Sequence, residues 1–258
     1  MTRPLKRHVE MESLFGADFL PISKKRHGGT EARSGAPAAP PAAASTPLGT
    51  SPARPVATKK GTSTFPYAWE QDWPAEFQTF RTEVLDCTKC GLCSTRTQVV
   101  FGTGPIATPL MFVGEAPGED EDRKGEPFVG RAGQLLTSTL KRFGVERSQV
   151  FIANILKCRP PGNRTPAPDE MASCMPWLQR QIATIRPKVI CGLGNIAVQT
   201  LLVTKTGITK LRGRLTQAQG VPFFPTFHPA YILRNMSDQP LFEADIKAVL
   251  QLAGLIAP

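Results

Sequence analysis

The sequence predicts an α/β fold, a three-layer α/β/α sandwich around a central, mainly parallel sheet of four strands. Two observations carry this prediction. Four short apolar runs are bounded by turn residues, as buried strands are, and stretches with helical spacing of apolar side chains alternate with them. Strands that alternate with helices run parallel, and both faces of their sheet are covered. The expected strands are residues 110–113, 150–153, 189–191 and 222–227.

The expected helices lie between and after these strands. Residues 132–143 have apolar side chains at helical spacing and stop at Gly144, a residue that commonly follows a helix. Residues 168–185 begin with Pro-Asp-Glu, which suits a first helical turn. Residues 195–202 follow Gly194, and residues 241–255 are apolar on one face. Ligands of parallel sheets bind beyond the carboxyl ends of the strands, so we expect the site in the segments that follow them.

The first 64 residues differ in composition from the rest of the chain. Residues 34–64 consist mainly of Ala, Pro, Ser, Thr and Gly, which cannot bury enough apolar surface to offset the entropy of ordering them. We therefore expect a disordered basic tail and linker over residues 1–64 and one domain over residues 65–258. No apolar run is long enough to span a membrane, and no signal-peptide pattern opens the chain, so we expect a cytoplasmic protein.

The net charge of +10 is unevenly distributed along the chain. Residues 171–237 contain eight basic side chains and neither Asp nor Glu, which indicates a surface for a polyanion. The alternative is a chance run that acidic side chains from elsewhere neutralise in the fold. We expect nucleic acid as the partner. The eight residues are Arg180, Arg186, Lys188, Lys205, Lys210, Arg212, Arg214 and Arg234.

Five of the six cysteines are spaced as metal ligands are. Three form two overlapping C-x-x-C pairs at positions 87, 90 and 93, and two more lie at positions 158 and 174. In an intracellular chain such clustering indicates a metal site rather than disulfides. Four thiolates hold either zinc or a four-iron cluster, and the spacing does not separate the two. Cys191 lies in an expected strand and is interpreted as a core residue.

Unusual residues follow three of the expected strands. The first is followed by the segment 114–118 and an acidic run at 119–122, the second by Asn154, and the fourth by His228. By default the acidic run is a solvated loop, but it stands where a site is expected. His228 is the only histidine in the predicted domain, and its place at a strand end favours function over a structural role. Phe128, after a proline in a loop, is either a core residue or a face for stacking a base.

A glycine pattern at residues 192–197 fits the relaxed G-x-G-x-x-A signature of dinucleotide-binding sites. The acidic residue that would hold a ribose about 20 positions further on is missing. We therefore exclude a nucleotide cofactor. Contact of this helix start with a DNA phosphate and plain helix capping both remain open.

Together these residues resemble the family 4 uracil-DNA glycosylases, the iron–sulfur branch of that superfamily. The resemblance runs from about Cys87 to Leu255 and does not include the tail. Four matching segments occur in order: Gly-Glu-Ala-Pro-Gly at 114–118, Gly-Glu-Pro-Phe-Val-Gly-Arg-Ala-Gly at 125–133, Asn-Ile-Leu-Lys-Cys-Arg-Pro-Pro at 154–161, and His-Pro-Ala-Tyr-Ile-Leu-Arg-Asn at 228–235.

The resemblance implies a DNA-repair enzyme that flips uracil out of DNA and hydrolyses its N-glycosidic bond, leaving an abasic site. It implies His228 as the catalytic histidine, Asn154 as the residue that reads uracil, and Phe128 as the stacking aromatic. Glu115, the backbone of Ala116, and Glu121 are implied as pocket residues. Glu115 is also the candidate for positioning water, with a role in shaping the pocket as the alternative. The expected partner is uracil-containing DNA, bound by a monomer.

The resemblance also implies a [4Fe–4S] cluster. The interval to residues 99–102 places Cys87 and Cys90 in register with the family's C-x-x-C pair, and Cys158 and Cys174 complete the four ligands. Cys93 is then an additional cysteine and the second choice of ligand. Two other classes of protein fit less well. A DNA-binding module with a structural zinc does not explain His228 and Asn154 at strand ends, and a branch that traps its product on a loop histidine has no counterpart here, since residues 158–174 contain no histidine.

Overall fold

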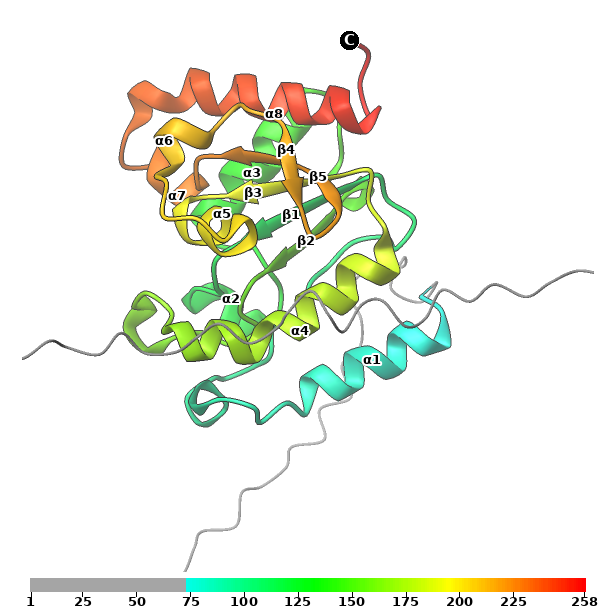
Figure 1. Ribbon diagram of the computed structural model, residues 1–258, viewed down its shortest axis with the longest axis vertical. Coiled ribbons are helices and arrows are strands. Elements are labelled where there is room, and N and C mark those ends of the chain that lie inside the picture. The colour runs from blue at the N-terminus through cyan, green and yellow to red at the C-terminus, as the bar shows by residue number, and fades with distance from the viewer. Residues whose placement is uncertain (1–72) are drawn as a thin grey trace, which may run out of the picture. The chain divides into compact units, whose positions relative to one another are not determined.

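The computed structural model describes residues 73–258. The predicted tail over residues 1–64 lies outside the described residues, as does the start of the predicted domain. Within residues 73–258 a five-stranded sheet is covered by helices on both faces, with α3 and α8 on one side and α1 and α4 on the other (Figure 1). The predicted three-layer α/β/α architecture is confirmed.

The sheet has the strand order β2-β1-β3-β5-β4. Its strands are β1 Leu110–Gly114, β2 Phe151–Asn154, β3 Val189–Leu193, β4 Thr216–Ala218 and β5 Val221–Thr226. The first three and β5 run parallel, so their carboxyl ends share one edge of the sheet. The chain adds β2 on one side of β1 and β3 on the other. This reversal leaves a crevice beyond the strand ends, the usual place for a ligand.

The prediction of four strands was wrong by one, because β4 was missed. This strand has three residues, of which only Ala218 is buried, so it has no apolar run of its own. It exists because a two-residue turn folds it back, antiparallel, onto β5. The turn residues Gln219 and Gly220 have φ values of 54° and 73°, the left-handed conformation that tight hairpin turns require.

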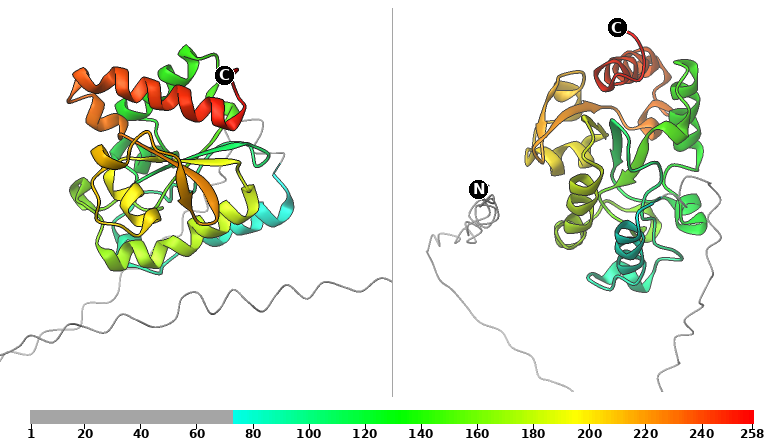
Figure 2. Two further views of the ribbon diagram at one scale, coloured as in Figure 1. Left: turned by 45° about the horizontal axis from the view of Figure 1, so that its top comes forward. Right: turned by 90° about the vertical axis from the view of Figure 1, so that its right-hand side faces the viewer.

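Four longer helices were predicted within two residues at each end. They are α3 Arg131–Arg142, α4 Pro168–Ile185, α5 Asn195–Leu202 and α8 Gln239–Ala253. Alternate residues of the strands reach the two helical layers, as the two-residue repeat of a strand requires. In β1, Met111 and Val113 pack in the cluster with α4 and α5, whereas Leu110 and Phe112 pack in the cluster with α3 and α8. Figure 2 shows the sheet edge-on between these layers.

Four of the α-helices in residues 73–258 were not predicted, two of them single short turns. In α1, Ala75–Leu85, the buried residues Phe77, Phe80 and Val84 are spaced by three and four residues, a helical signal that the sequence carries. The acidic run expected as a solvated loop forms the first turn of α2, Glu119–Lys124, where negative charge favours a helix. Short helices complete the fold: α6 Ile208–Leu211, α7 Pro229–Ile232, and 3-10 turns η2 Gly91–Ser94, η3 Arg147–Gln149, η4 Pro161–Asn163 and η5 Met236–Asp238.

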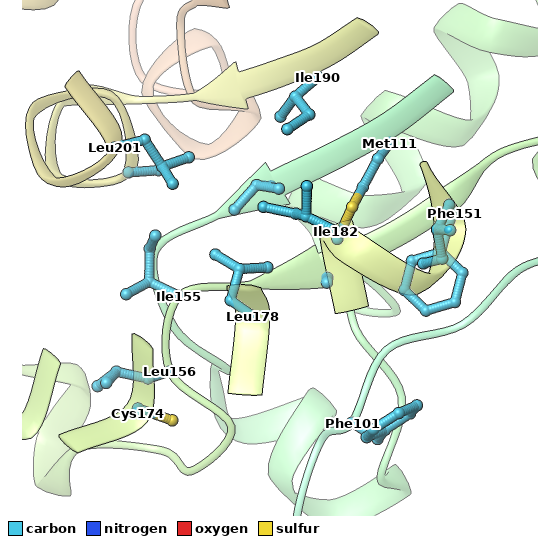
Figure 3. Packing of buried hydrophobic residues seen from close by; sticks show 14 of the residues in the cluster. Phe101, Met111, Phe151, Ile155, Leu156, Cys174, Leu178, Ile182, Ile190 and Leu201 are labelled. Atoms are coloured by element: carbon cyan, nitrogen blue, oxygen red, sulfur yellow. The ribbon is translucent and has the colours of Figure 1, made fainter. Parts of the chain in front are cut away.

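The core beneath α4 and α5 extends to the predicted metal ligands. Figure 3 shows Cys174 beside Leu156 at the margin of the packed side chains, and Leu178 and Ile182 of the same helix lie in their interior. The described helices include none with the length and apolarity needed to cross a membrane.

Candidate active site

A cavity of about 440 Å³ opens at the carboxyl ends of the parallel strands. This volume is in the range of small-molecule sites. All six residues predicted for catalysis or substrate binding contribute to its walls: Glu115, Ala116, Glu121, Phe128, Asn154 and His228. The rest of the lining comes mainly from α7, its flanking residues and the segment after Cys158. The strand ends therefore bring together residues that are more than a hundred positions apart in sequence, as the parallel sheet predicts.

Asn154 is the last residue of β2, and its amide oxygen is buried without a hydrogen-bond donor. The side chain is 2% exposed, and its Oδ1 accepts no hydrogen bond from any described residue. Leaving a buried polar atom unpaired costs about 1–3 kcal/mol. The backbone carbonyl of Asn154, by contrast, accepts a hydrogen bond from Lys157 Nζ at 2.9 Å. A free acceptor on a fixed backbone indicates a ligand that donates a hydrogen bond here.

Phe128 presents its ring beside His228. The two ring centroids are 5.6 Å apart, with 32° between the planes. Phe128 has a φ of 53°, a conformation that non-glycine residues rarely adopt. Two glycines make room for it: a Cβ on Gly133 would lie 1.8 Å from the Phe128 carbonyl oxygen, and one on Gly114 would lie 2.6 Å from the ring. Close backbone packing therefore fixes the position of this ring.

His228 caps the N-terminus of α7, and its surroundings define its protonation. Nδ1 accepts a hydrogen bond from the backbone N–H of Ala230 at 3.1 Å, so in the neutral ring the proton is on Nε2. Burial, and then the positive charge of Arg234, lower the pKa of His228 to about 4. Near neutral pH the imidazole is therefore uncharged and has one N–H to donate through Nε2.

Glu115 follows β1 and is half-buried in the cavity wall. Burial raises the pKa of its carboxyl group above the usual value. Its backbone carbonyl accepts a hydrogen bond from Leu156 N–H at 3.0 Å, which continues the pairing of β1 and β2 past the strand ends. The carboxyl group is thus attached to a rigid element and binds a proton more tightly than an exposed glutamate does.

Glu121 also lines the cavity, but its oxygens are engaged by backbone. Oε1 accepts hydrogen bonds from the N–H groups of Val129 and Gly130, both at 2.9 Å, and Oε2 accepts one from Gly118 at 3.1 Å. This carboxylate joins the loop that carries Phe128 to the loop after β1. Its contacts are those of a residue that positions the cavity wall.

Further positioning residues were missed from the sequence. Asp122 is 3% exposed and accepts hydrogen bonds from the backbone N–H groups of Thr97 at 2.9 and 3.0 Å and Gln98 at 3.4 Å. Arg147 donates to the Phe128 carbonyl at 3.2 Å. The acidic run at a strand end was the available signal for Asp122. No local pattern indicated Arg147, because its contact spans 19 residues.

A second hollow is surrounded by cysteines. It is lined by Cys87, Cys90, Cys93, Cys158 and Cys174 together with Lys89, Arg96, Lys157 and Ser173. All of these cysteines are free thiols. The structure therefore brings the four predicted ligands to one place, with Cys93 beside them. Among residues 73–258, no three His, Cys, Asp or Glu side chains meet the spacing for a metal ion.

Three of these sulfur atoms accept hydrogen bonds from N–H groups. Cys87 accepts one from Trp177 Nε1, Cys158 one from Arg96 Nη1, and Cys174 one from the backbone N–H of Lys157, each at 3.3 Å. Burial raises the pKa of Cys174 to about 11, opposed by the charge of Lys157. Donors and positive charge around these sulfurs are the surroundings that cluster-bound thiolates have.

The basic run at 171–237 is partly neutralised in the fold. Arg212 forms a two-pronged ion pair with Asp245, whose side chain is 6% exposed, and Arg180 pairs with Glu83. Both acids come from outside the run, so these two arginines are not part of a free basic surface. Arg214 is exposed, and Arg234 is exposed at the cavity.

Comparisons with known proteins match this region. Residues 101–252 match the family model described as the Uracil DNA glycosylase superfamily. The chain is 49% identical over 158 residues to a type-4 uracil-DNA glycosylase of Thermotoga maritima, covering 60% of this chain and 82% of the relative. It is 45% identical over 186 residues to the type-4 enzyme of Sulfurisphaera tokodaii (68% and 84%) and 41% over 184 residues to that of Archaeoglobus fulgidus (68% and 92%).

Proposed function

Since the chain belongs to the uracil-DNA glycosylase superfamily and to its type-4 branch, we propose that it excises uracil from DNA by hydrolysing the N-glycosidic bond. The observation that carries this function in the structure is the unpaired Oδ1 of Asn154, which shares one cavity with the ring of Phe128 and the donor of His228. A base inside a duplex cannot reach such a cavity, so the target nucleotide must be flipped out of the stack.

Asn154 reads the edge of the flipped base. Oδ1 accepts the imide N–H of uracil, and Nδ2 donates to the neighbouring carbonyl oxygen, since an amide offers both functions side by side. Cytosine has no N–H at that ring nitrogen and presents an amino group where uracil has an oxygen. It would leave the amide unpaired, and buried hydrogen-bonding sites reject such analogues strongly. Phe128 stacks on the face of the base.

His228 assists the departure of uracil. Cleavage leaves an oxocarbenium-like sugar and a uracil anion, and the Nε2–H of a neutral imidazole donates to the oxygen on which negative charge develops. One such donor contributes about 3 kcal/mol to stabilising a transition state. The low pKa of His228 keeps the ring a donor with a fixed proton near neutral pH.

Glu115 orients the water that completes the hydrolysis. Its raised pKa gives the carboxylate a greater affinity for a proton from water than an exposed glutamate has. The water adds its oxygen to the sugar, the proton passes to the carboxylate, and an abasic site remains. We propose that the protein acts on uracil-containing DNA as a monomer in the cytoplasm, with the six predicted residues of the site on the wall of one cavity.

Formation of alkali-labile sites tests the proposed function. The purified protein, incubated with DNA that carries one uracil, should convert that position to an alkali-labile site, whereas a matched oligonucleotide with cytosine should stay intact. Binding of the uracil-containing DNA without any strand cleavage after alkali would contradict the proposal and favour a non-enzymatic DNA-binding module.

We further infer that Cys87, Cys90, Cys158 and Cys174 bind a [4Fe–4S] cluster. The N–H donors on three of the four sulfurs and the nearby Arg96 and Lys157 fit an anionic cluster. When bound, it supplies a negatively charged link between distant chain segments. Glycosidic hydrolysis is redox-neutral, and the residues of the cavity carry out its steps.

Iron and sulfide analysis with visible spectroscopy tests the ligand set. Anaerobically purified protein should contain iron and sulfide and absorb in the visible range. Cys90→Ser should lose this absorbance, whereas Cys93→Ser should retain it. Stoichiometric zinc in a colourless wild-type protein would contradict the cluster. If Cys93→Ser loses the absorbance and Cys90→Ser keeps it, Cys93 rather than Cys90 is the ligand.

A further inference from the structure

Lys157 is buried between the cysteines and the backbone carbonyl of Asn154. Its side chain is 1% exposed. Nζ donates hydrogen bonds to the Asn154 carbonyl oxygen at 2.9 Å and to Oε1 of Gln181 at 2.7 Å. Gln181 is also fully buried, and its Nε2 donates to the Phe101 carbonyl at 2.8 Å. That bond fixes the orientation of the Gln181 amide, so its oxygen faces Lys157 and the ammonium group is held at one position.

The other end of Lys157 touches the predicted cluster site. Its backbone N–H donates to Cys174 Sγ at 3.3 Å, and its neighbour in the chain is Cys158. None of the ion pairs within residues 73–258 includes Lys157, and Lys157 lines the second hollow together with Cys158 and Cys174. A buried ammonium group without a countercharge is costly. A negatively charged cluster on these thiolates supplies that countercharge.

We propose that Lys157 is a positioning residue that links the cysteine cluster to the base-reading amide of Asn154. The negative cluster retains the buried ammonium group, which in turn holds the Asn154 backbone and so directs Oδ1 toward the base. The inference rests on the proposed uracil excision and deepens it. Because coupling between two sites is reciprocal, occupation of the base pocket should stabilise the cluster, and loss of the cluster should weaken base recognition.

Binding of free uracil tests the first half of this link. Lys157→Met keeps the length of the side chain and removes the ammonium group. We expect it to weaken the inhibition of excision by free uracil about tenfold or more, the usual effect of removing a residue that supports a ligand shell. Affinity for abasic-site DNA should stay unchanged, since the proposed role of Asn154 is to read the base and abasic-site DNA has none at that position. Lys247→Met, at an exposed lysine of α8, is the matched control and should change neither quantity.

Retention of the cluster tests the second half. Visible absorbance of the wild-type protein under a chelator should decay more slowly with saturating free uracil than without it. In Lys157→Met the decay should be faster and independent of uracil. Gln181→Met leaves the ammonium group but removes one of its acceptors. It should therefore change the uracil inhibition and the decay of absorbance in the same direction as Lys157→Met, but by less. If Lys157→Met does not fold, Gln181→Met takes its place in both tests.

The outcomes separate this inference from the proposed function. A wild-type protein that releases no uracil from DNA overturns the function. A wild-type protein that excises uracil while uracil leaves the decay of absorbance unchanged overturns only the link through Lys157. A Lys157→Met protein with wild-type uracil inhibition and uracil-dependent decay overturns it as well. A uniform loss of thermal stability, DNA affinity and uracil affinity would assign Lys157 a purely structural role.

Discussion

At the scale of single residues, His228 combines two properties that its position creates. The Ala230 N–H occupies Nδ1, and burial with the charge of Arg234 keeps the ring neutral. The hydrogen bond by which His228 caps α7 thus also determines that its Nε2, and not its Nδ1, can donate to a ligand. The sequence indicated the histidine by its place after a strand, but it could not indicate the tautomer, which depends on contacts that only the folded α7 supplies.

Replacing His228 by Ala should remove the donor to the departing uracil. We expect the single-turnover excision rate to fall roughly 10²- to 10³-fold, while affinity for abasic-site DNA changes little because the DNA contacts remain. The measurement is excision under enzyme excess, with thermal unfolding as a control for the fold. A full excision rate with a lowered unfolding temperature would make His228 structural and assign the leaving group to another donor.

Glu115 should define an acidic limb in the pH dependence of excision. A general base must be deprotonated, and burial raises the pKa of Glu115 above 4.5. The rate should therefore decline as pH falls through that raised pKa, above the pH near 4 at which His228 protonates. Glu115→Gln should lower the rate roughly 10²-fold or more and flatten the profile in this window. An unchanged limb in Glu115→Gln would leave this residue with a role in shaping the pocket only.

At the scale of elements, the sequence predicted the strands and helices whose formation depends on the pattern of their own side chains. Apolar runs located the four parallel strands, and periodicity with Pro168 located α4 to the residue. Elements defined by their partners were missed. The strand β4 depends on pairing with β5, and the carboxylates of α2 depend on amides elsewhere in the chain, as the contact of Asp122 with Thr97 shows. Sequence pattern carries no information about such partners.

The start of α3 supports the ring of Phe128, and this contact can be broken with one methyl group. A Cβ on Gly133 would lie 1.8 Å from the Phe128 carbonyl oxygen, so Gly133→Ala must displace the loop. We expect excision to be nearly abolished and the free energy of unfolding to fall by about 1–3 kcal/mol, measured by chemical denaturation. Gly207→Ala, where a Cβ meets nothing within 4 Å, is the control. Equal effects of the two substitutions would contradict close packing at Gly133.

At the scale of the whole molecule, the sequence predicted which residues lie together in the candidate site, but not which basic side chains near it are paired with acids. Strand ends and the family resemblance named the six residues that share the cavity. The basic run was less informative, because charge in the sequence does not show which side chains pair in space. Arg212 is bound to Asp245, so it stabilises the packing of α8 against the end of α6, whereas Arg214 and Arg234 remain exposed.

The exposed arginines should therefore contribute to DNA binding and Arg212 to stability. Arg234→Gln should weaken binding of uracil-containing DNA and reduce the slope of log affinity against log salt by about 0.9 for each phosphate that the protein no longer neutralises. Arg212→Gln should leave the slope unchanged and lower the unfolding temperature, because the buried Asp245 then loses its charged partner and keeps only the hydrogen bond from Thr226. Binding across a salt series, with thermal unfolding of each variant, distinguishes the two. An unchanged slope in Arg234→Gln would place the DNA elsewhere.

The cysteines that surround the second hollow come from two stretches of chain about 70 residues apart. The proposed cluster, bound to both stretches, would close that length of chain into a ring for as long as it stays bound. By the chain-entropy argument for cross-links, a ring of this size is worth about 4 kcal/mol of reduced freedom in the unfolded ensemble. Loss of the proposed cluster would open this ring, and a protease should then cut the segment between η2 and β1 sooner than in the protein that holds the cluster.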